Sequence, residues 1–350
     1  MARVVLISFR LGGSDGVSIE SDKWTAALQS MGHEVLHVAG EGDVDILIPG
    51  LAIGAPTAPT RKELERAFEG SQLVIVENIA SLPLNVAARD VLYRALDGRN
   101  ALFHHHDLAW QRQHLAHLEG PRDQPTWRHV TINDRSRREL DLRSISATTI
   151  RNSFDCDPPL GNRESTRQRH HVSNRTLLLM PTRAIARKNV AGALRLASDL
   201  DAVLWLLGPS EDGYEEQLQG LLAHTDVEVR QGLAGDMSVH DAYAACDLVV
   251  MASTWEGFGN PVLESVTHHR ALAVHPYPVL EEIASFGFHF FGLDDVDQIR
   301  EFLRHPDETR LERNLSIARA HFNVIDLPAR LAPLLELDES DVRESLDASR

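Results

Sequence analysis

Short apolar runs alternate with longer segments of helical spacing along the whole 350-residue chain. Runs rich in Val, Ile and Leu are typical of buried strands, and apolar residues three or four positions apart are typical of amphipathic helices. Strands are predicted near residues 3–8, 34–39, 45–48, 72–76, 100–105, 128–132 and 147–150, and then near 176–181, 202–207, 227–230, 247–251, 271–274 and 288–291. Helices are predicted near residues 17–31, 60–69, 83–97, 109–118 and 134–141, and then near 190–199, 213–223, 238–245, 261–268, 279–285, 294–303 and 307–321. This alternation indicates parallel sheets joined by crossover helices.

The alternation is interrupted once, over residues 155–175, where prolines and polar side chains follow no apolar period. Such a composition is typical of a linker. Because 350 residues exceed one ordinary hydrophobic core, two doubly wound α/β domains are expected. The first domain covers 1–155, the linker covers 156–175, and the second domain covers 176–325, before a C-terminal helix and tail at 326–350.

Charge and cysteine content narrow the functional classes. The formal net charge of −16 disfavours nucleic acid and anionic membranes as partners, because both need a basic face. The only two cysteines, Cys156 and Cys246, imply no disulfide framework, which fits a reducing cytoplasm. No apolar run approaches the roughly 18 residues of a membrane span, and the first residues read as a strand. The oligomeric state leaves no signal in the sequence.

The segment STWEGFGNPVLE, residues 253–264, places a carboxylate on each side of a glycine-containing turn. It follows the predicted strand 247–251, and a helix start is expected with Asn260 as its N-cap. Glu256 would lie on the loop and Glu264 near the first turn of the helix, at the sheet edge where open α/β sheets bind ligands. Backbone N–H groups for a ligand are expected at Gly257, Phe258, Gly259 and Asn260. Two carboxylates suit a polyol, and a solvated loop before a surface helix is the alternative.

Two cations follow the predicted strand 176–181, in the segment TRAIARKN. Arg183 and Lys188 would lie beside a helix start capped by Asn189, an arrangement that suits a diphosphate. The alternative is a pair of ordinary surface cations, and Lys188 is in either case expected to be accessible to solvent. The next predicted strand, in LWLLGP, ends at Gly208, whose missing side chain permits close approach of a ligand.

The order TRAIARKN, LWLLGP, AYAACDLVVMASTWEGFGNPVLES and PVLEEI resembles the donor half of family-4 retaining glycosyltransferases, the glycosyl transferases group 1. The spacing of Glu256 and Glu264 is similar to the E-x7-E motif of that family, and Arg183 and Lys188 have the offset of its phosphate-binding pair. The resemblance covers nearly the whole second domain. It implies GT-B architecture, two Rossmann-like domains facing across a cleft. The family usually has Gly before the arginine, where this chain has Thr182.

The first half is similar to the same family. The segment SDGVSIESDKWTAALQSMGHEV resembles its glycine loop and long helix, with Asp15-Gly16 in place of the usual Gly-Gly. ALFHHHDLAW places His106 just after a strand, where the family has a histidine beside the reacting sugar. The alternatives are a metal site built from His104 to His106, or a buried core histidine. Adjacent residues of a strand point to opposite faces, so three consecutive histidines do not converge easily.

The resemblance implies transfer of a hexose from a UDP- or GDP-sugar to an acceptor hydroxyl, with retention at the anomeric carbon. Arg183 and Lys188 would neutralise the departing diphosphate, assisted by amides near Gly16. Glu264 would bind the ribose hydroxyls and Glu256 the hydroxyls of the transferred sugar. His106 would orient the sugar or the acceptor hydroxyl. No metal and no other cofactor is required on this interpretation, because protein cations take that role.

Other functions stay open at this point. A nucleotide-sugar 2-epimerase-like isomerase would share the donor site without needing an acceptor, and a catalytically silent binding protein would keep only the fold. A dinucleotide-dependent dehydrogenase is disfavoured, because RLGGSDG does not give the G-x-G-x-x-G spacing. The acceptor is expected to be a soluble small molecule or a glycan, since no basic amphipathic face is apparent, and a lipid-linked acceptor stays open.

Overall fold

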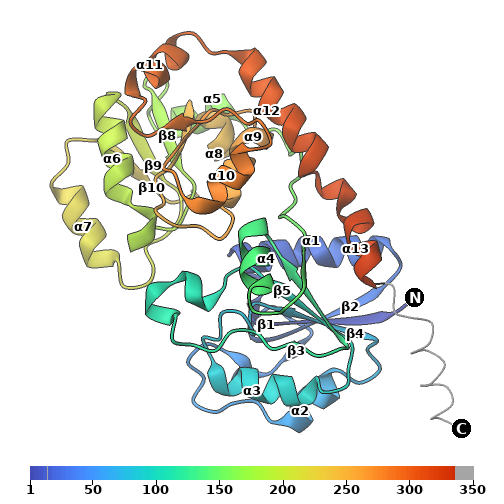
Figure 1. Ribbon diagram of the computed structural model, residues 1–350. Coiled ribbons are helices and arrows are strands. Elements are labelled where there is room, and N and C mark those ends of the chain that lie inside the picture. The colour runs from blue at the N-terminus through green and yellow to red at the C-terminus, as the bar shows by residue number, and fades with distance from the viewer. Residues whose placement is uncertain (14, 336–350) are drawn as a thin grey trace, which may run out of the picture. The chain divides into compact units, whose positions relative to one another are not determined.

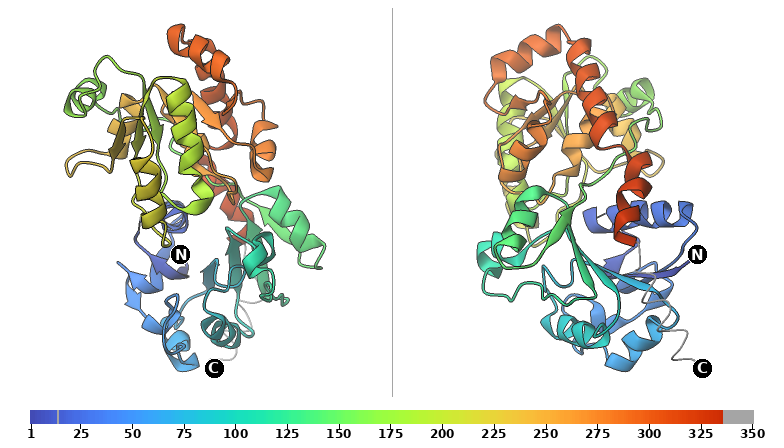
Figure 2. Two further views of the ribbon diagram at one scale, coloured as in Figure 1. Left: turned by 90° about the vertical axis from the view of Figure 1, so that its left-hand side faces the viewer. Right: turned by 45° about the vertical axis from the view of Figure 1, so that its right-hand side comes forward.

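The computed structural model describes residues 1–13 and 15–335, which fall into two compact units. Among the described residues, unit 1 contains 1–153 and 324–335, and unit 2 contains Phe154–Asn323. Each unit is a parallel sheet with helices on both faces (Figures 1 and 2), as the alternating apolar pattern predicts. The chain passes from unit 1 to unit 2 after Ser153 and returns after Asn323, so its C-terminal helix belongs to the first unit.

Unit 1 has a 7-stranded sheet in the order β3-β2-β1-β4-β5-β6-β7, with every pair parallel. The strands are β1 Arg3–Leu11, β2 Glu34–Gly42, β3 Ile46–Leu47, β4 Leu73–Glu77, β5 Ala101–His105, β6 Trp127–Thr131 and β7 Ala147–Thr149. The helices are α1 Gly16–Ser30, α2 Arg61–Ala67, α3 Val86–Ala95, α4 Asp134–Asp141 and α13 Leu327–Leu335, with short 3-10 helices η1 Pro49–Leu51, η2 Ala109–Gln111, η3 Gln113–Leu115 and η5 Val324–Asp326.

Unit 2 has a 6-stranded parallel sheet in the order β10-β9-β8-β11-β12-β13. The strands are β8 Leu177–Met180, β9 Val203–Leu206, β10 Val229–Gln231, β11 Leu248–Met251, β12 Leu272–Val274 and β13 Phe291–Gly292. The helices are α5 Arg163–Arg169, the 3-10 helix η4 Ala186–Lys188, α6 Val190–Asp199, α7 Glu215–Ala223, α8 Val239–Ala245, α9 Asn260–Thr267, α10 Pro278–Ala284, α11 Val296–Arg304 and α12 Glu308–His321. Numbered from its own first strand, this is the 3-2-1-4-5-6 order of nucleotide-binding folds.

The alternation of side chains along β1 shows how one strand serves two cores. Val5 and Ile7 point to the core under α2 and α3, whereas Val4 and Leu6 point to the core under α1 and α13. Figure 1 shows these two helix pairs on opposite faces of the sheet. A strand covered on both sides buries nearly all its side chains, which explains the continuous apolar runs of the sequence.

The strand order fixes where a ligand can bind in each unit. The direction in which successive strands are added to the sheet reverses between β1 and β4 in unit 1, and between β8 and β11 in unit 2. Loops leaving two such strands run in opposite directions and leave a crevice at the carboxyl edge of the sheet. The segments that follow β8 and β11 carry the cations and carboxylates predicted for the donor. In unit 1, Glu77 is the last residue of β4 and His106 directly follows β5.

Two segments differ from the sequence expectation. The predicted helix 109–118 is wrong: the chain forms only η2 and η3 there, because no side chain of residues 111–118 is buried and the segment has no buried apolar stripe. The expected linker 156–175 contains α5, which packs against α8. Arg163 of α5 donates to the carbonyl oxygens of Ala244, Ala245 and Cys246 at 2.9–3.0 Å. Because hydrogen bonds from arginine to carbonyl oxygens hold this helix in place, it does not need a buried apolar stripe. Its sequence accordingly shows no apolar period. The expected tail beyond residue 335 lies outside the described residues.

Candidate active site

The carboxyl end of β8 in unit 2 leads into two cations that share one carboxylate. Lys188 Nζ lies 2.5 Å from Glu256 Oε1, and Arg187 Nη1 lies 2.7 Å from Glu256 Oε2. Glu256 lies on the loop after β11, as predicted, so the pair links the two strands at which the order reverses. Arg187 also donates to the carbonyl oxygen of Trp255 at 3.0 Å. The loop carrying Glu256 is therefore fastened to the β8 side by both cations.

Burial makes this ion pair different from a surface contact. The side chain of Lys188 is 9% exposed and that of Glu256 is 8% exposed, so the expectation that Lys188 is accessible to solvent is wrong. Burial alone would raise the pKa of Glu256, but the charges of Lys188 and Arg187 outweigh it and the pKa is lowered. Burial lowers the pKa of Lys188 despite the neighbouring carboxylate. An ionised Glu256 is thus held in place by its two cations.

Arg183 is paired with a different carboxylate. Its Nη1 lies 2.5 Å from Glu211 Oε2, and both side chains are about one-third exposed (31% and 37%). The three cations Arg183, Arg187 and Lys188 thus pair with two carboxylates, Glu211 and Glu256. The group that lies close to Gly208 is the protein's own backbone, because a Cβ at this position would lie 2.6 Å from the backbone nitrogen of Arg183. Gly208 therefore lets the Arg183 loop pass, and does not by itself make room for a ligand.

Glu264 lies on α9, the helix that directly follows the loop of Glu256. Its Oε2 accepts a hydrogen bond of 2.7 Å from the hydroxyl of Tyr243, a fully buried side chain of α8. Burial, reinforced by the charge of Glu264, raises the pKa of Tyr243 well above its usual value, so the phenol stays protonated and remains a donor. Tyr243 thereby orients the Glu264 carboxylate, which is itself half-buried.

The turn between the two glutamates is shaped by Gly259. Its φ of 93° lies in the left-handed region, and a Cβ would fall 2.2 Å from the Tyr277 hydroxyl. That hydroxyl donates to the carbonyl oxygen of Phe258 at 2.8 Å. Gly259 is also the N-cap residue of α9, so the prediction of Asn260 as N-cap is wrong by one position, and the helix receives no side-chain cap. Gly257 and Phe258 lie in the turn that leads to this helix start.

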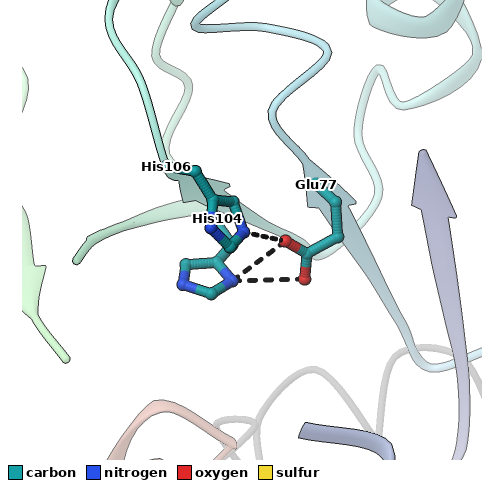
Figure 3. A group of neighbouring side chains, drawn as sticks. All are labelled: Glu77, His104 and His106. Carbon is teal, nitrogen blue, oxygen red and sulfur yellow. Dashed lines mark hydrogen bonds and ion pairs between the residues drawn. The ribbon is translucent and has the colours of Figure 1, made fainter. Parts of the chain in front are cut away.

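In unit 1, His106 follows β5 and its Nε2 lies 2.7 Å from Glu77 Oε2 at the end of β4. His104 Nδ1 approaches the same oxygen at 3.0 Å (Figure 3). His105 points to the other face of the strand and bonds His129 at 2.9 Å. We call Glu77, His104 and His106 the histidine cluster. As expected for a strand, only alternate histidines converge.

The ligand-type atoms of the histidine cluster lie within 4.8 Å of one another, which raises the question of a metal. Both ring nitrogens, however, are at hydrogen-bonding distance from one carboxylate oxygen, and Glu77 and His104 have no exposed surface. These nitrogen–oxygen distances are those of hydrogen bonds. The cluster is a hydrogen-bonded network.

Asp15 changes the first turn of α1, where Gly16 was predicted to help hold the donor. The Asp15 carboxylate is the N-cap and accepts from the backbone N–H groups of Val17 at 3.1 Å and Ser18 at 3.3 Å. Arg10 Nε lies 3.2 Å from the same carboxylate. The two amides beyond Gly16 are thus already satisfied by a protein anion, so the geometry gives no support to the role predicted for Gly16.

Several residues of these sites were missed in the sequence. Glu77 directly follows the predicted strand 72–76, and His106 directly follows the predicted strand 100–105. These two strands are neighbours, and adjacent parallel strands end at one sheet edge. The position of Glu77 at a strand end is the signal that identifies it. Arg187 is identified by its place directly before Lys188. Tyr243 and Tyr277 left no signal, because each lies on a different helix or loop and meets its partner only in the folded sheet.

Among the described residues, no helix has both the length and the apolar character needed to cross a bilayer. Residues 162–304 match the family model for glycosyl transferases group 1. The chain is 25% identical to the mannosylglucosylglycerate synthase of Thermotoga maritima, covering 92% of this chain and 97% of that protein. It is 26% identical to the enzyme of the same name from Petrotoga mobilis, covering 82% and 86%.

Solved structures agree on the fold. HepE of Anabaena, crystallised with UDP and glucose, superimposes with a TM-score of 0.74 at 15% identity, over 96% of this chain and 99% of that one. Sucrose-phosphate synthase of Thermosynechococcus elongatus gives 0.72 at 16% identity, over all of both chains. The family model over residues 162–304, the two relatives and the shared GT-B fold of two Rossmann-like units thus support a glycosyltransferase of group 1.

Proposed function

We propose that this glycosyltransferase moves a hexosyl group from a UDP- or GDP-sugar to a hydroxyl of a small soluble sugar derivative, with retention at the anomeric carbon. The observation that carries the proposal is the grouping of Arg183, Arg187 and Lys188 where strand order reverses in unit 2, beside the loop of Glu256. A nucleoside diphosphate needs such cations when it leaves, because negative charge accumulates on its outer phosphate.

Each donor-side residue has a role that its surroundings support. Arg183 and Lys188 neutralise the diphosphate, and the N-terminus of α9 offers it the positive end of a helix dipole. Glu264, oriented by Tyr243, accepts hydrogen bonds from the ribose hydroxyls. Glu256 holds the cations and accepts from a hydroxyl of the transferred sugar. His106 contacts the sugar or the acceptor, and neither a metal nor another cofactor takes part.

The names of the two relatives supply the first acceptor to test. Mannosylglucosylglycerate contains mannose joined to glucosylglycerate, so a mannosyl donor and a glucosylglycerate acceptor head the list. The complex of HepE with UDP and glucose makes UDP-glucose the second donor to test. A glycan or a lipid-linked sugar is the remaining class of acceptor.

The testing experiment incubates the protein with GDP-mannose or UDP-glucose, with and without glucosylglycerate, and follows the anomeric proton of the product by NMR. The proposal expects a new glycoside that keeps the donor's anomeric configuration and requires acceptor. An inverted product would contradict retention. A changed sugar nucleotide formed without acceptor would instead indicate an isomerase. Nucleotide binding without any turnover, over a broad panel of acceptors, would indicate a catalytically silent protein.

A further inference from the structure

The histidine cluster of unit 1 is built by two neighbouring strands of the sheet. Residue Glu77 of β4 is in register with His104 of β5, and His106 lies two residues further along, on the same face. A single oxygen of Glu77 is 3.0 Å from His104 Nδ1 and 2.7 Å from His106 Nε2 (Figure 3). His104 also stacks on Trp24 of α1, with ring centroids 4.1 Å apart. The carboxylate and both rings are therefore held from two sides.

Only His106 of this cluster has any exposed surface. Glu77 and His104 are fully buried, whereas His106 is 5% exposed. Its Nε2 is committed to Glu77, so Nδ1 is the ring atom left to meet a ligand. His104 has no such role, because its Nε2 is buried and makes no hydrogen bond to a described residue.

The charges of the neighbouring side chains favour the protonated form of His106. Burial would raise the pKa of Glu77, but the two histidines outweigh it and lower the pKa to about 2. Burial opposes the charge on His106, but the hydrogen bond and charge of Glu77 outweigh it and raise the pKa. Burial lowers the pKa of His104, which leaves that ring neutral.

The other groups around His106 act in the same direction. Glu20 of α1 and Asp107 each raise its pKa further. Each of these acids has its own cation: Lys23 Nζ lies 2.9 Å from Glu20, and Arg112 Nη2 lies 2.9 Å from Asp107. His104 and His105, the remaining titratable neighbours on the strand, are neutral because burial lowers their pKa. Glu77 is thus the charged group that touches His106 directly.

We propose that Glu77 is a positioning residue that fixes the His106 ring through Nε2–H, so that His106 presents a charged Nδ1–H donor to an oxygen of the sugar donor or acceptor. This inference rests on the proposed function, because it assumes that His106 contacts a reactant. It also assigns the direction of the hydrogen bond. A ring that carries both protons gives a hydrogen bond and cannot take the proton of the acceptor hydroxyl, so His106 is not the base of the reaction.

The substitution Glu77→Gln tests the proposal, because it keeps the shape and an acceptor oxygen but removes the charge. Spectra of ¹⁵N-histidine-labelled full-length protein report the protonation of each ring nitrogen, and His106→Gln assigns the signals. In the wild type, His106 should be doubly protonated at pH 7 and lose a proton only at higher pH. In Glu77→Gln it should be neutral at pH 7. Glu69→Gln, at an exposed glutamate of the same unit, should behave as wild type.

The same variants give a kinetic signature. With the donor and acceptor found above, kcat should fall by about 10²-fold in Glu77→Gln, the usual cost of losing one oriented donor, while the KM for the sugar nucleotide changes little. The alkaline fall in kcat should also move to lower pH. A structural defect alone would lower the yield of folded protein without moving this pH limb.

The outcomes separate this inference from the proposed function. A wild-type His106 that is neutral at pH 7 would overturn it, whether or not any variant folds. So would stoichiometric Zn²⁺ that survives dialysis, because a metal-bound nitrogen carries no proton. A failure to bind nucleotide would contradict the proposed function and not this inference, because the residues proposed to bind the nucleotide belong to unit 2. A charged His106 with unchanged catalysis in Glu77→Gln would also contradict the proposal.

Discussion

The residues proposed to bind the donor include a buried ion pair. Lys188 and Glu256 are each more than nine-tenths buried, and Arg187 is the only other cation that an ion pair brings to Glu256 among the described residues. A buried pair contributes little net stability, but a lone buried charge is costly. Any substitution in this group therefore changes folding stability as well as ligand binding, and the two effects must be measured separately.

We expect Lys188→Ala to lower the free energy of unfolding by about 3 kcal/mol, because Glu256 would keep only Arg187. Arg183→Ala, which breaks a pair that is about one-third exposed, should cost less than about 1 kcal/mol. Urea denaturation of the two variants measures both values. Equal losses would show that the Lys188–Glu256 pair is solvated in solution. Both variants should weaken nucleotide binding, so Arg183→Ala is the cleaner probe of the diphosphate.

At the residue scale, the sequence predicted the sheet edge at which the proposed donor-site side chains lie, but not how these side chains are paired. Arg183, Lys188, Glu256 and Glu264 lie at the predicted sheet edge, because strand ends are visible as apolar runs. The partners of these residues come from elsewhere in the chain, as Tyr243 does for Glu264. Only the three-dimensional arrangement of the strands brings such partners together.

At the scale of elements, the turn from β11 to α9 depends on glycine for a reason internal to the chain. Gly259 has a positive φ and lies against the Tyr277 hydroxyl. The sequence indicated a flexible turn, whereas the structure has a tightly packed one. The same distinction applies to α5, a helix whose arginines bind carbonyl oxygens and whose polar sequence is typical of a linker.

We expect Gly259→Ala to lower the thermal midpoint and to weaken nucleotide binding at least tenfold, because the new Cβ would displace Tyr277 and strain the backbone. Gly220→Ala is the matched control. Gly220 lies within α7, where a Cβ meets nothing within 4 Å, so alanine should be neutral or stabilise by up to about 1 kcal/mol. Differential scanning fluorimetry with and without nucleotide measures both variants. Wild-type binding in Gly259→Ala would show that the turn is dispensable.

At the scale of the whole molecule, each unit has its own hydrophobic core, but only unit 2 is one continuous stretch of chain. Unit 1 is completed by α13, whose Leu327 and Leu331 are fully buried against α1 and the sheet. The sequence predicted a C-terminal helix but gave no sign of the domain to which it returns, because an apolar helix face does not identify its partner.

Leu331→Ala should therefore destabilise unit 1 by about 2–5 kcal/mol while leaving the affinity for nucleotide unchanged, because the donor-side residues belong to unit 2. Leu142→Ala, at a side chain that is 83% exposed, is the control and should have no measurable effect. Chemical denaturation followed by nucleotide titration tests both statements. An affinity that falls together with stability would place part of the nucleotide site in unit 1.

The central claim is that Glu264 and the cations after β8 bind a nucleoside diphosphate. Its most direct test is thermal stabilisation of the wild type, Glu264→Gln and the exposed-site control Glu216→Gln by UDP, GDP, ADP and dTDP. A nucleotide at about 100 times its dissociation constant should add roughly 2.7 kcal/mol of stability to the wild type and the control. We predict this response for UDP or GDP and its loss in Glu264→Gln. Equal stabilisation of Glu264→Gln, or no response of the wild type to any nucleotide, would contradict the account.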